Sequence, residues 1–323
     1  MDRPPQVTYL MPIVASSPPS PELTDYLRSI ADRVQLIVVD GSPERVFAAA
    51  HAQWAPWARH VRPQPRHACA MGKVQGVLTG LDLAQTDVVI IADDDVRYEP
   101  DALGAVVEAL EHAEVVIPQN YFDPLPWHAI WDTGRILVNR VLGGDFPGTL
   151  GVRAGALRAT GGYDGDVMFE NLELIRTVEV AGGSARRLPD VYVRRLPPSS
   201  RHFVTQRVRQ AYDEFARPVR LAAALGILPT VVAMAWRRPR WLPVAVGVVM
   251  ATAEIGRRKG DGRAHFPWAA SVAAPCWVLE RAVCAWIAAG ARLRGGVPYR
   301  GARIRCAAHS VRQLRRRQLA AVA

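Results

Sequence analysis

Residues 71–103 read MGKVQGVLTGLDLAQTDVVIIADDDVRYEPDAL, and this stretch decides the fold. It predicts a helix over 72–84, an apolar strand over Asp87–Ala92 and a second helix that begins at Pro100–Asp101. A strand with a continuous apolar run is covered on both faces, which is typical of a parallel sheet between helices. The triplet Asp93–Asp95 then follows the carboxyl end of the strand, the edge where such sheets carry their chemistry.

The flanking segments continue the alternation of strands and helices up to about residue 217. We expect strands over 7–14, 34–39 and 114–117, and helices over 23–31 and 102–111. The sequence therefore predicts an α/β fold with a mainly parallel sheet flanked by helices over residues 1–217.

Composition excludes several classes of protein. With 50% hydrophobic and 22% charged residues, the 323-residue chain is neither disordered nor, with its glycines and prolines in no repeating order, collagen-like. Its cysteines have neither the close pairing of a zinc site nor the density of a disulfide scaffold, which favours a reducing compartment; they are Cys69, Cys276, Cys284 and Cys306. The apolar run near the N-terminus is too short for a signal peptide, so we expect a protein that is not secreted.

The net charge of +10 comes almost entirely from arginine, because Lys73 and Lys259 are the only lysines. Guanidinium groups suit phosphate, although such a bias also follows from a GC-rich genome. The arginines are dispersed or flank apolar segments, and no nucleic-acid-binding motif is present. We therefore expect no nucleic-acid partner.

Residues 218–290 are strongly apolar, unlike the preceding part of the chain. The apolar stretches are Leu221–Trp236, Trp241–Ala253 and Phe266–Ala289, and arginines flank all of them. The first two are shorter than the roughly 20 residues of a spanning helix, and spanning would place an arginine cluster outside. We expect an interfacial or re-entrant hairpin on the cytoplasmic leaflet, with a two-pass hairpin and an ordinary helical subdomain as alternatives.

The tail, residues 291–323, is basic. Its run Arg312–Arg317 is either a solvated charged face or a contact with anionic lipid.

Several polar residues stand where chemistry is expected. Asp93 and Asp95, two residues apart after a strand, can bind one oxygen-seeking cation, which would bridge a diphosphate; the alternative is an acidic turn that caps the next helix. Asp40 follows a second strand and can accept hydrogen bonds from a base or ribose. Gly72–Lys73 opens a helix and could hold an anion. A carboxylate from the segment around Glu170 could deprotonate an acceptor hydroxyl.

The order of these elements resembles the family 2 inverting glycosyltransferases of GT-A fold, over roughly residues 5–215. The similar segments are TYLMPIV, IVVDGSP, the stretch 71–103 and TGGYDGDVMFENLELIRTVEVAGG. In addition, QRVRQ at 206–210 resembles the Q-x-x-R-W motif of processive and ceramide-glucosyltransferase-like members.

The resemblance implies a role for each matching residue. Asp40 would contact the base or ribose, and Asp93 and Asp95 would form the D-x-D pair that binds Mg²⁺ or Mn²⁺. The other donor-binding or acceptor-channel positions would be Lys73, Asp94, Gln206 and Arg209.

Two departures from the family pattern concern catalysis. The family's usual Glu-Asp is Glu170-Asn171 here, and an amide cannot act as a base. We favour Glu170 as the base, with Glu173 as the alternative. The motif's terminal Trp is Gln210. The tail segment GGVPYRG (295–301) is partly similar to the W-x-G-R-x-Y segment of ceramide-glucosyltransferase-like and carotenoid-pathway enzymes.

The sequence thus predicts a metal-dependent inverting glycosyltransferase at the cytoplasmic face of the cell membrane. Its donor would be a nucleotide-diphosphate sugar, most often UDP-linked in this family, and its acceptor a hydroxyl of a lipid or lipid-linked molecule. One alternative is a polyprenyl-phosphate glycosyl synthase, whose lipid-phosphate acceptor needs no base. Another is an inactive scaffold that keeps the sugar-nucleotide fold.

Overall fold

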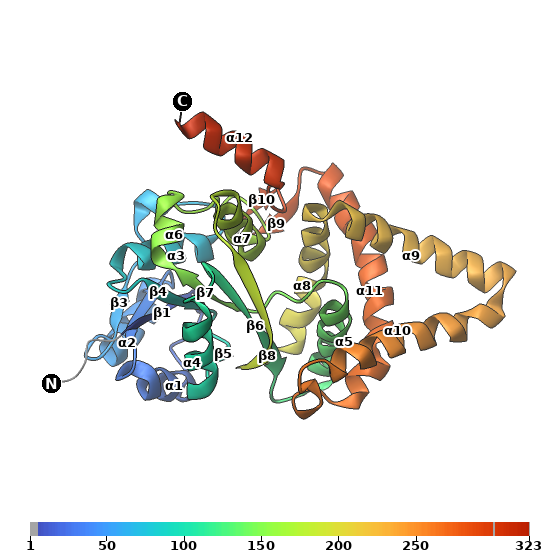
Figure 1. Ribbon diagram of the computed structural model, residues 1–323, viewed down its shortest axis with the longest axis horizontal. Coiled ribbons are helices and arrows are strands. Elements are labelled where there is room, and N and C mark those ends of the chain that lie inside the picture. The colour runs from blue at the N-terminus through green and yellow to red at the C-terminus, as the bar shows by residue number, and fades with distance from the viewer. Residues whose placement is uncertain (1–5, 300, 323) are drawn as a thin grey trace. The chain divides into compact units, whose positions relative to one another are not determined.

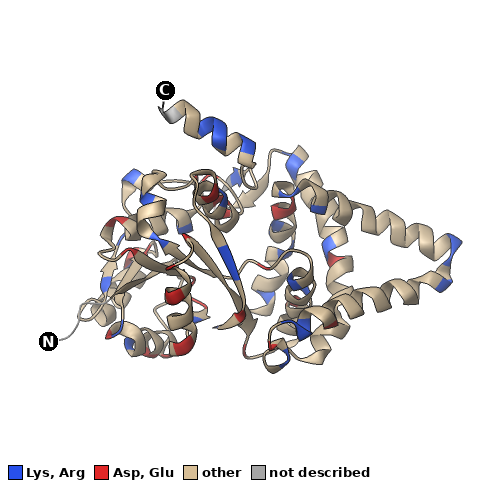
Figure 2. Ribbon diagram, in the orientation of Figure 1, with Lys and Arg blue, Asp and Glu red and all other residues tan. Residues whose placement is uncertain are grey.

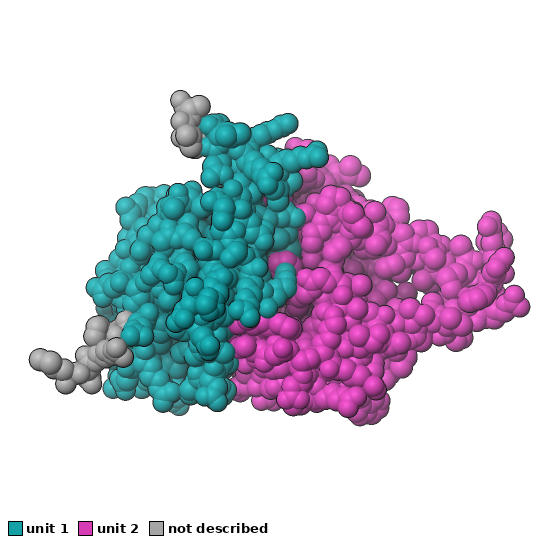
Figure 3. Space-filling view, viewed as in Figure 1, with its two compact units in different colours: residues 1–118, 147–187, 310–323 teal, residues 119–146, 188–309 magenta. Residues whose placement is uncertain are grey.

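The computed structural model describes residues 6–299 and 301–322 (Figure 1). The chain divides into two compact units (Figure 3). Unit 1 comprises residues 1–118, 147–187 and 310–323, and unit 2 comprises residues 119–146 and 188–309.

An eight-stranded sheet, in the order β3-β2-β1-β4-β7-β6-β8-β5, forms the centre of the α/β fold. β1 is parallel to β2 and β4, and β2 is parallel to β3, whereas β7 is antiparallel to both β4 and β6. The strands are β1 Val7–Ile13, β2 Gln35–Asp40, β3 Arg59–Val61, β4 Val88–Ala92, β5 Val96–Arg97, β6 Val115–Phe122, β7 Thr149–Arg153 and β8 Ala185–Arg195. The mainly parallel sheet is confirmed, and the strand expected at 114–117 runs on to Phe122.

The helices of unit 1 are α1 Pro21–Ala31, α2 Glu44–Trp54, η1 Pro65–His67, α3 Gly72–Leu83, α4 Pro100–Ala109, α6 Ala154–Ala159, α7 Glu170–Val180 and α12 Val311–Val322. α1, α2, α3 and α6 pack against the sheet. α3 lies close on β1 because a Cβ at Gly76 or Gly80 would come within 2.7 Å of Pro12 or 2.0 Å of Leu10. The absence of a side chain at Gly76 and Gly80 therefore allows α3 to pack closely on the sheet.

Unit 2 is built mainly of helices. They are α5 Trp127–Val141, α8 Ser200–Tyr212, η2 Asp213–Ala216, α9 Pro218–Arg237, η3 Pro239–Trp241, α10 Leu242–Arg258, η4 Gly262–Ala264 and α11 Trp268–Leu293. α11 packs against α5, α8, α9 and α10. A short antiparallel pair, β9 Val297–Tyr299 and β10 Ala302–Ile304, follows α11; Arg300, in the expected tail motif, lies outside the described residues.

Unit 2 does not coincide with the domain predicted along the chain at 218–290. α5 and α8, which precede residue 218, belong to it because the buried face of α5 packs against α10 and α11. The tail is likewise divided, since α12 belongs to unit 1 and packs against α7.

Two helices of unit 2, α9 and α11, are long and apolar enough to cross a membrane by length and composition. α9 has 20 residues and is therefore longer than the apolar stretch 221–236. It begins at Pro218, a residue suited to the first turn of a helix, and ends at Arg237. Only 6% of the most apolar 18-residue stretch of α9 is buried, whereas 39% of the corresponding stretch of α11 is buried. α9 and α10 form a hairpin whose connecting turn carries Arg237, Arg238 and Arg240 (Figure 2).

Candidate active site

The aspartate triplet forms a tight turn at the carboxyl end of β4. The backbone N–H of Asp93 donates to the carbonyl of Gly148 at 2.8 Å, and that of Val96 donates to the carbonyl of Asp93 at 3.1 Å. The turn leaves Asp93 and Asp95 half-buried and Asp94 exposed. The predicted D-x-D pair therefore stands at the sheet edge, as expected.

Lys73 joins this turn to the acceptor-side segment. Its Nζ lies 2.7 Å from Oδ1 of Asp93 and 3.0 Å from Oε1 of Glu170. All three side chains are between 16% and 22% exposed, so the cluster is shielded but reachable from solvent. The structure thus brings together three residues that the sequence analysis selected from separate segments.

The loops before α3 and α7 bring Lys73 and Glu170 together. The backbone N–H of Met71 donates to the carbonyl of Gly165 at 2.8 Å, and that of Ala70 donates to Oδ1 of Asp166 at 2.9 Å. A Cβ at Gly165 would come within 2.2 Å of Sγ of Cys69, so glycine is needed for the close approach. Since the two loops are bound together, the first turns of α3 and α7 present Lys73 and Glu170 to each other.

Electrostatics keep the Lys73 amine charged. Burial disfavours the charge, but the carboxylates of Asp93 and Glu170 outweigh burial and raise the pKa of Lys73 well above its ordinary value. Tyr163 is buried nearby, and burial is the main reason that the pKa of its hydroxyl is raised. Tyr163 was not selected from the sequence, although it lies within the quoted TGGYDGD segment.

Glu170 and Glu173 differ in accessibility. Glu173 is fully buried, whereas the Glu170 side chain is 16% exposed. Asn171, the departure from the family pattern, donates from Nδ2 to the carbonyl of Pro147 at 3.2 Å. Accessibility therefore favours Glu170 over Glu173 as a group that meets substrate.

Asp40 is buried at the end of β2. Its Oδ1 accepts the backbone N–H of Ser42 at 2.7 Å, and its Oδ2 lies 3.1 Å from Nε2 of His60. Burial alone would raise the pKa of Asp40, but these contacts lower it. In this arrangement Asp40 orients the turn after β2, and its contact with a base or ribose stays a prediction.

Gln206 and Arg209 lie on α8 in unit 2. Gln206 contacts the ring of His202, and the Arg209 guanidinium stands 5.5 Å from the centre of the Tyr299 ring. Their place near a diphosphate or acceptor stays a prediction.

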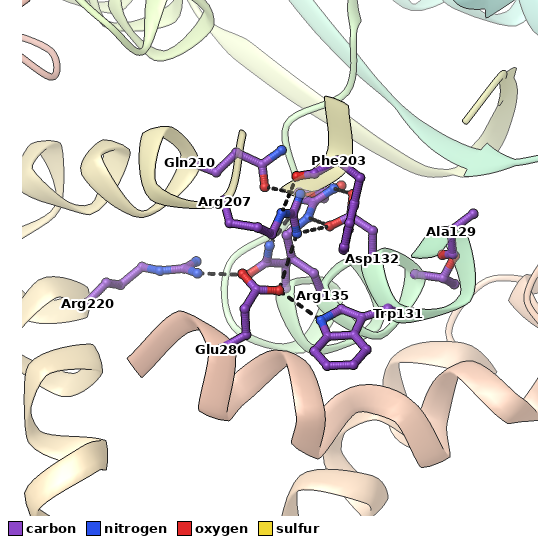
Figure 4. A network of polar contacts seen from close by, with 12 residues as sticks. Ala129, Trp131, Asp132, Arg135, Phe203, Arg207, Gln210, Arg220 and Glu280 are labelled. Atoms are coloured by element: carbon purple, nitrogen blue, oxygen red, sulfur yellow. Dashed lines mark hydrogen bonds and ion pairs between the residues drawn. The ribbon is translucent and has the colours of Figure 1, made fainter. Parts of the chain in front are cut away.

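Unit 2 also contains a buried charged network that the sequence analysis did not select (Figure 4). Oδ1 of Asp132 accepts from Nε of Arg135 and from Nη1 of Arg207, both at 2.9 Å. Arg135 also pairs with Asp145, and Arg207 lies 3.6 Å from Oε2 of Glu280. These residues lie on α5, on the loop that follows it, on α8 and on α11, so no local sequence motif indicates the network.

Residues 12–159 match the family model of Glycosyl transferase family 2. The match makes this segment similar to that family. The matched segment includes Lys73 and the D-x-D turn and ends before Glu170. No curated protein matches the chain.

The fold is also found in solved structures. The mannosyltransferase PcManGT from Pyrobaculum calidifontis, solved in complex with GDP-Man and Mn2+, has a TM-score of 0.51 at 19% identity, with 88% of each chain covered. Mannosyl-3-phosphoglycerate synthase from Rubrobacter xylanophilus has a TM-score of 0.45 at 14% identity, covering 68% of this chain and 75% of that one. Glucosyl-3-phosphoglycerate synthase from M. tuberculosis has a TM-score of 0.43 at 16% identity, covering 64% and 78%. The first likeness supports the GT-A fold; the ceramide-glucosyltransferase-like layout stays a prediction.

The donor set of the turn fits a divalent cation. Asp93 and Asp95 are carboxylates two residues apart, and hard cations such as Mg²⁺ and Mn²⁺ prefer oxygen ligands. The Lys73 ammonium, at 2.7 Å from Asp93, competes with such a cation for the same carboxylate.

Proposed function

We propose that the protein transfers a sugar, with inversion, from a nucleotide-diphosphate sugar to a hydroxyl of a lipid or lipid-linked acceptor. The observation that carries the proposal is the contact of Lys73 with both Asp93 and Glu170. It joins the donor-side turn of a family 2 domain to a carboxylate of the acceptor-side segment. A uridine nucleotide is the donor we would test first.

The donor would be held at the carboxyl edge of β4. Asp93 and Asp95 would bind Mg²⁺ or Mn²⁺, which supplies positive charge for the departing diphosphate. The Lys73 ammonium adds a second positive charge at this edge and, because its pKa is raised, stays protonated at neutral pH. Asp94 is exposed on the same turn and can bind a donor hydroxyl.

Glu170 would act on the acceptor. Its carboxylate accepts the proton of the acceptor hydroxyl while the hydroxyl oxygen bonds to the anomeric carbon and the bond to the diphosphate breaks. Attack from the side opposite the leaving group inverts the configuration. Lys73, 3.0 Å away, orients the Glu170 carboxylate for this proton transfer.

The α9–α10 hairpin supports a membrane-associated acceptor. Its exposed apolar side chains include Val219 at 85% and Trp236 at 84% on α9, Trp241 in the connecting η3 and Val248 on α10. Exposed apolar surface of this extent marks a protein or membrane contact, and tryptophan is frequent at membrane interfaces.

The turn of the hairpin decides how it would meet a bilayer. Tip-first entry into one leaflet would place Arg237, Arg238 and Arg240 near the bilayer centre, at about 2.5–3.5 kcal/mol each. On α10, the charge-free residues 241–253 span about 20 Å, less than the ~30 Å hydrocarbon core. An interfacial position on the cytoplasmic leaflet of the cell membrane, with the arginines at the headgroups, fits both facts.

The polyprenyl-phosphate synthase is the second candidate function, and Asn171 favours it. A phosphate acceptor is already anionic and needs no base, which agrees with the loss of the family's second carboxylate. Glu170→Gln separates the two: a hydroxyl acceptor predicts a large loss of turnover, and a phosphate acceptor predicts a small one.

The test is a binding titration of the detergent-purified protein with a panel of nucleotide-diphosphate sugars, with and without Mn²⁺. We expect metal-dependent binding of one donor that is lost in an Asp93→Asn/Asp95→Asn variant and kept in Asp101→Asn, an exposed aspartate of α4. If the folded wild-type protein binds no donor, the transferase proposal is wrong and the scaffold alternative is favoured.

A further inference from the structure

We infer that the outward face of α12 docks on the anionic headgroups of a lipid bilayer. This face consists of Arg312, Arg315, Arg316 and Leu319. The inference deepens the proposed function, because it rests on a lipid or lipid-linked acceptor and adds the surface of unit 1 that meets the bilayer. It is separate from the α9–α10 hairpin, which belongs to unit 2.

α12 begins at a capping box. The backbone N–H and the hydroxyl of Ser310 both donate to Oε1 of Gln313 at 2.9 Å, and the backbone N–H of Gln313 donates to Oγ of Ser310 at 3.3 Å. These reciprocal contacts fix the first turn, and the helix then continues to Val322. The arginines of the tail are therefore held at helical spacing.

One side of α12 attaches the helix to unit 1. Leu314 is 8% exposed, and α12 packs against α7. Three residues after Leu314, Nη1 of Arg317 pairs with Oδ2 of Asp164 at 2.6 Å. Asp164 lies in the loop before α7, where its Oδ1 accepts the backbone N–H of Asp166 at 2.7 Å. α12 thus contacts both the loop and the helix of the acceptor-side segment that carries Glu170.

The opposite side of α12 is exposed and cationic (Figure 2). Positions i, i+3, i+4 and i+7 share one face of a helix, and here they are Arg312, Arg315, Arg316 and Leu319. All four side chains are exposed, and that of Leu319 is 73% exposed. None of these three arginines has an acidic partner among residues 6–299 and 301–322, in contrast to Arg317.

The charge of this face is unfavourable to the helix itself. Like charges three or four residues apart on a helix repel each other. Arg312 also stands in the first turn, where the helix dipole is positive. Residues 311–322 contain no Asp or Glu, so no side chain of α12 offsets the repulsion. An anionic surface along this face removes the repulsion and is therefore electrostatically complementary to it.

Leu319 favours a lipid bilayer over a nucleic acid as the anionic partner. An exposed leucine among arginines can enter the boundary between headgroups and acyl chains while the guanidinium groups contact lipid phosphates, as interfacial amphipathic helices do. Proteins that bind single-stranded nucleic acid stack its bases on aromatic side chains, and residues 311–322 contain no aromatic residue.

The experiment measures partition of the full chain onto phosphatidylcholine vesicles with and without phosphatidylserine. Phosphatidylserine should strengthen partition of the wild type, because each arginine at an anionic surface contributes roughly a fivefold gain. The triple variant Arg312→Gln/Arg315→Gln/Arg316→Gln should therefore bind the anionic vesicles roughly 100-fold more weakly and bind phosphatidylcholine as the wild type does. High salt should reduce the gain of the wild type, since it screens exposed charges.

A second triple variant controls for net charge. Arg33→Gln/Arg45→Gln/Arg59→Gln removes the same charge from exposed arginines of unit 1 outside α12 and should keep most of the gain from phosphatidylserine. An equal loss in both triple variants would overturn the inference, because net charge alone would then explain it. The α12 variant should unfold at the same temperature as the wild type or a higher one, since it loses only repulsive contacts.

Hydrogen exchange of the wild-type chain on vesicles locates the contact, and it does so even if the α9–α10 hairpin alone keeps the protein on both kinds of vesicle. The amides of α12 should exchange more slowly on anionic vesicles than on phosphatidylcholine, whereas those of α2 should exchange equally on both. Equal exchange of the α12 amides on the two vesicles would overturn the inference.

Two further arms separate this surface from other readings. Binding of a single-stranded oligonucleotide that is tighter than binding of anionic vesicles, and is lost in the α12 variant, would overturn the lipid as partner. The metal-dependent donor titration in detergent does not involve α12. Failure of that titration therefore counts against the proposed transferase, whereas failure of the vesicle experiment counts against the α12 surface.

Discussion

Lys73→Met should destabilise unit 1 by an amount set by the carboxylates that it leaves behind. Oδ1 of Asp93 and Oε1 of Glu170 lie 2.7 and 3.0 Å from the same nitrogen, so they are at most about 5.7 Å apart. At an effective dielectric constant of about 20, two negative charges at that distance repel by about 3 kcal/mol. Because the side chains are partly exposed, we expect a loss of about 2–3 kcal/mol in the free energy of unfolding at pH 7.

Urea unfolding of the wild type and of Lys73→Met at pH 7 and pH 5 measures this loss. The difference between them should shrink at the lower pH, because protonation of one carboxyl relieves the repulsion in the variant. In the wild type, the raised pKa of Lys73 means that its stabilising contribution is complete below the ordinary lysine value and is lost only at more alkaline pH. Lys259→Met, the chain's other lysine, controls for the general loss of one charge.

Divalent metal provides a second readout. With the competing ammonium removed, Mn²⁺ without donor should stabilise Lys73→Met more than the wild type. Equal stability of the two proteins at pH 7, with no pH dependence of the difference and no gain from Mn²⁺, would refute the ion-pair reasoning.

Three further predictions concern single residues. Glu170→Gln should lower turnover with a hydroxyl acceptor about 10²–10⁴-fold while the donor dissociation constant, measured by titration, stays unchanged. Gly256→Ala should cost about 1–3 kcal/mol in urea unfolding, since its Cβ would lie 2.0 Å from the carbonyl oxygen of Leu137, whereas Gly247→Ala, with no atom within 4 Å, should be neutral or stabilising. Asp132→Asn should cost about 3–5 kcal/mol; although burial opposes the charge, Arg135 and Arg207 lower the pKa of Asp132, so its contribution is present near neutral pH and is lost on acidification.

The sequence predicted unit 1 well because its signals are local. The apolar strand before Asp93, the glycine-spaced helix after Met71 and the turn residues between them each depend on neighbouring positions. Their order along the chain is sufficient to indicate the fold, and the strands and helices found agree with the expected ranges to within a few residues in most cases.

The grouping of elements in unit 2 could not be predicted in this way. α5 lies between two strands of the sheet along the chain, yet it packs with α10 and α11. Gly134 permits that packing, because a Cβ there would lie 2.9 Å from the backbone of Ala274. Such a contact joins residues 140 positions apart, and hydrophobic periodicity reports a buried face without naming what covers it.

For the candidate site, the sequence by itself determined which residue types stand at the sheet edge: the aspartates after β4, Lys73 in the first turn of α3 and Glu170 at the start of α7. Tertiary structure decided that Lys73 touches both Asp93 and Glu170, that Glu173 is buried and that Asp40 faces Ser42 and His60. It also decided that Nε and Nη1 of the buried Arg281 have no hydrogen-bond partner among the described residues. The reason is physical: propensity and periodicity act over a few residues, whereas burial and ion pairing depend on distances that only the folded chain defines.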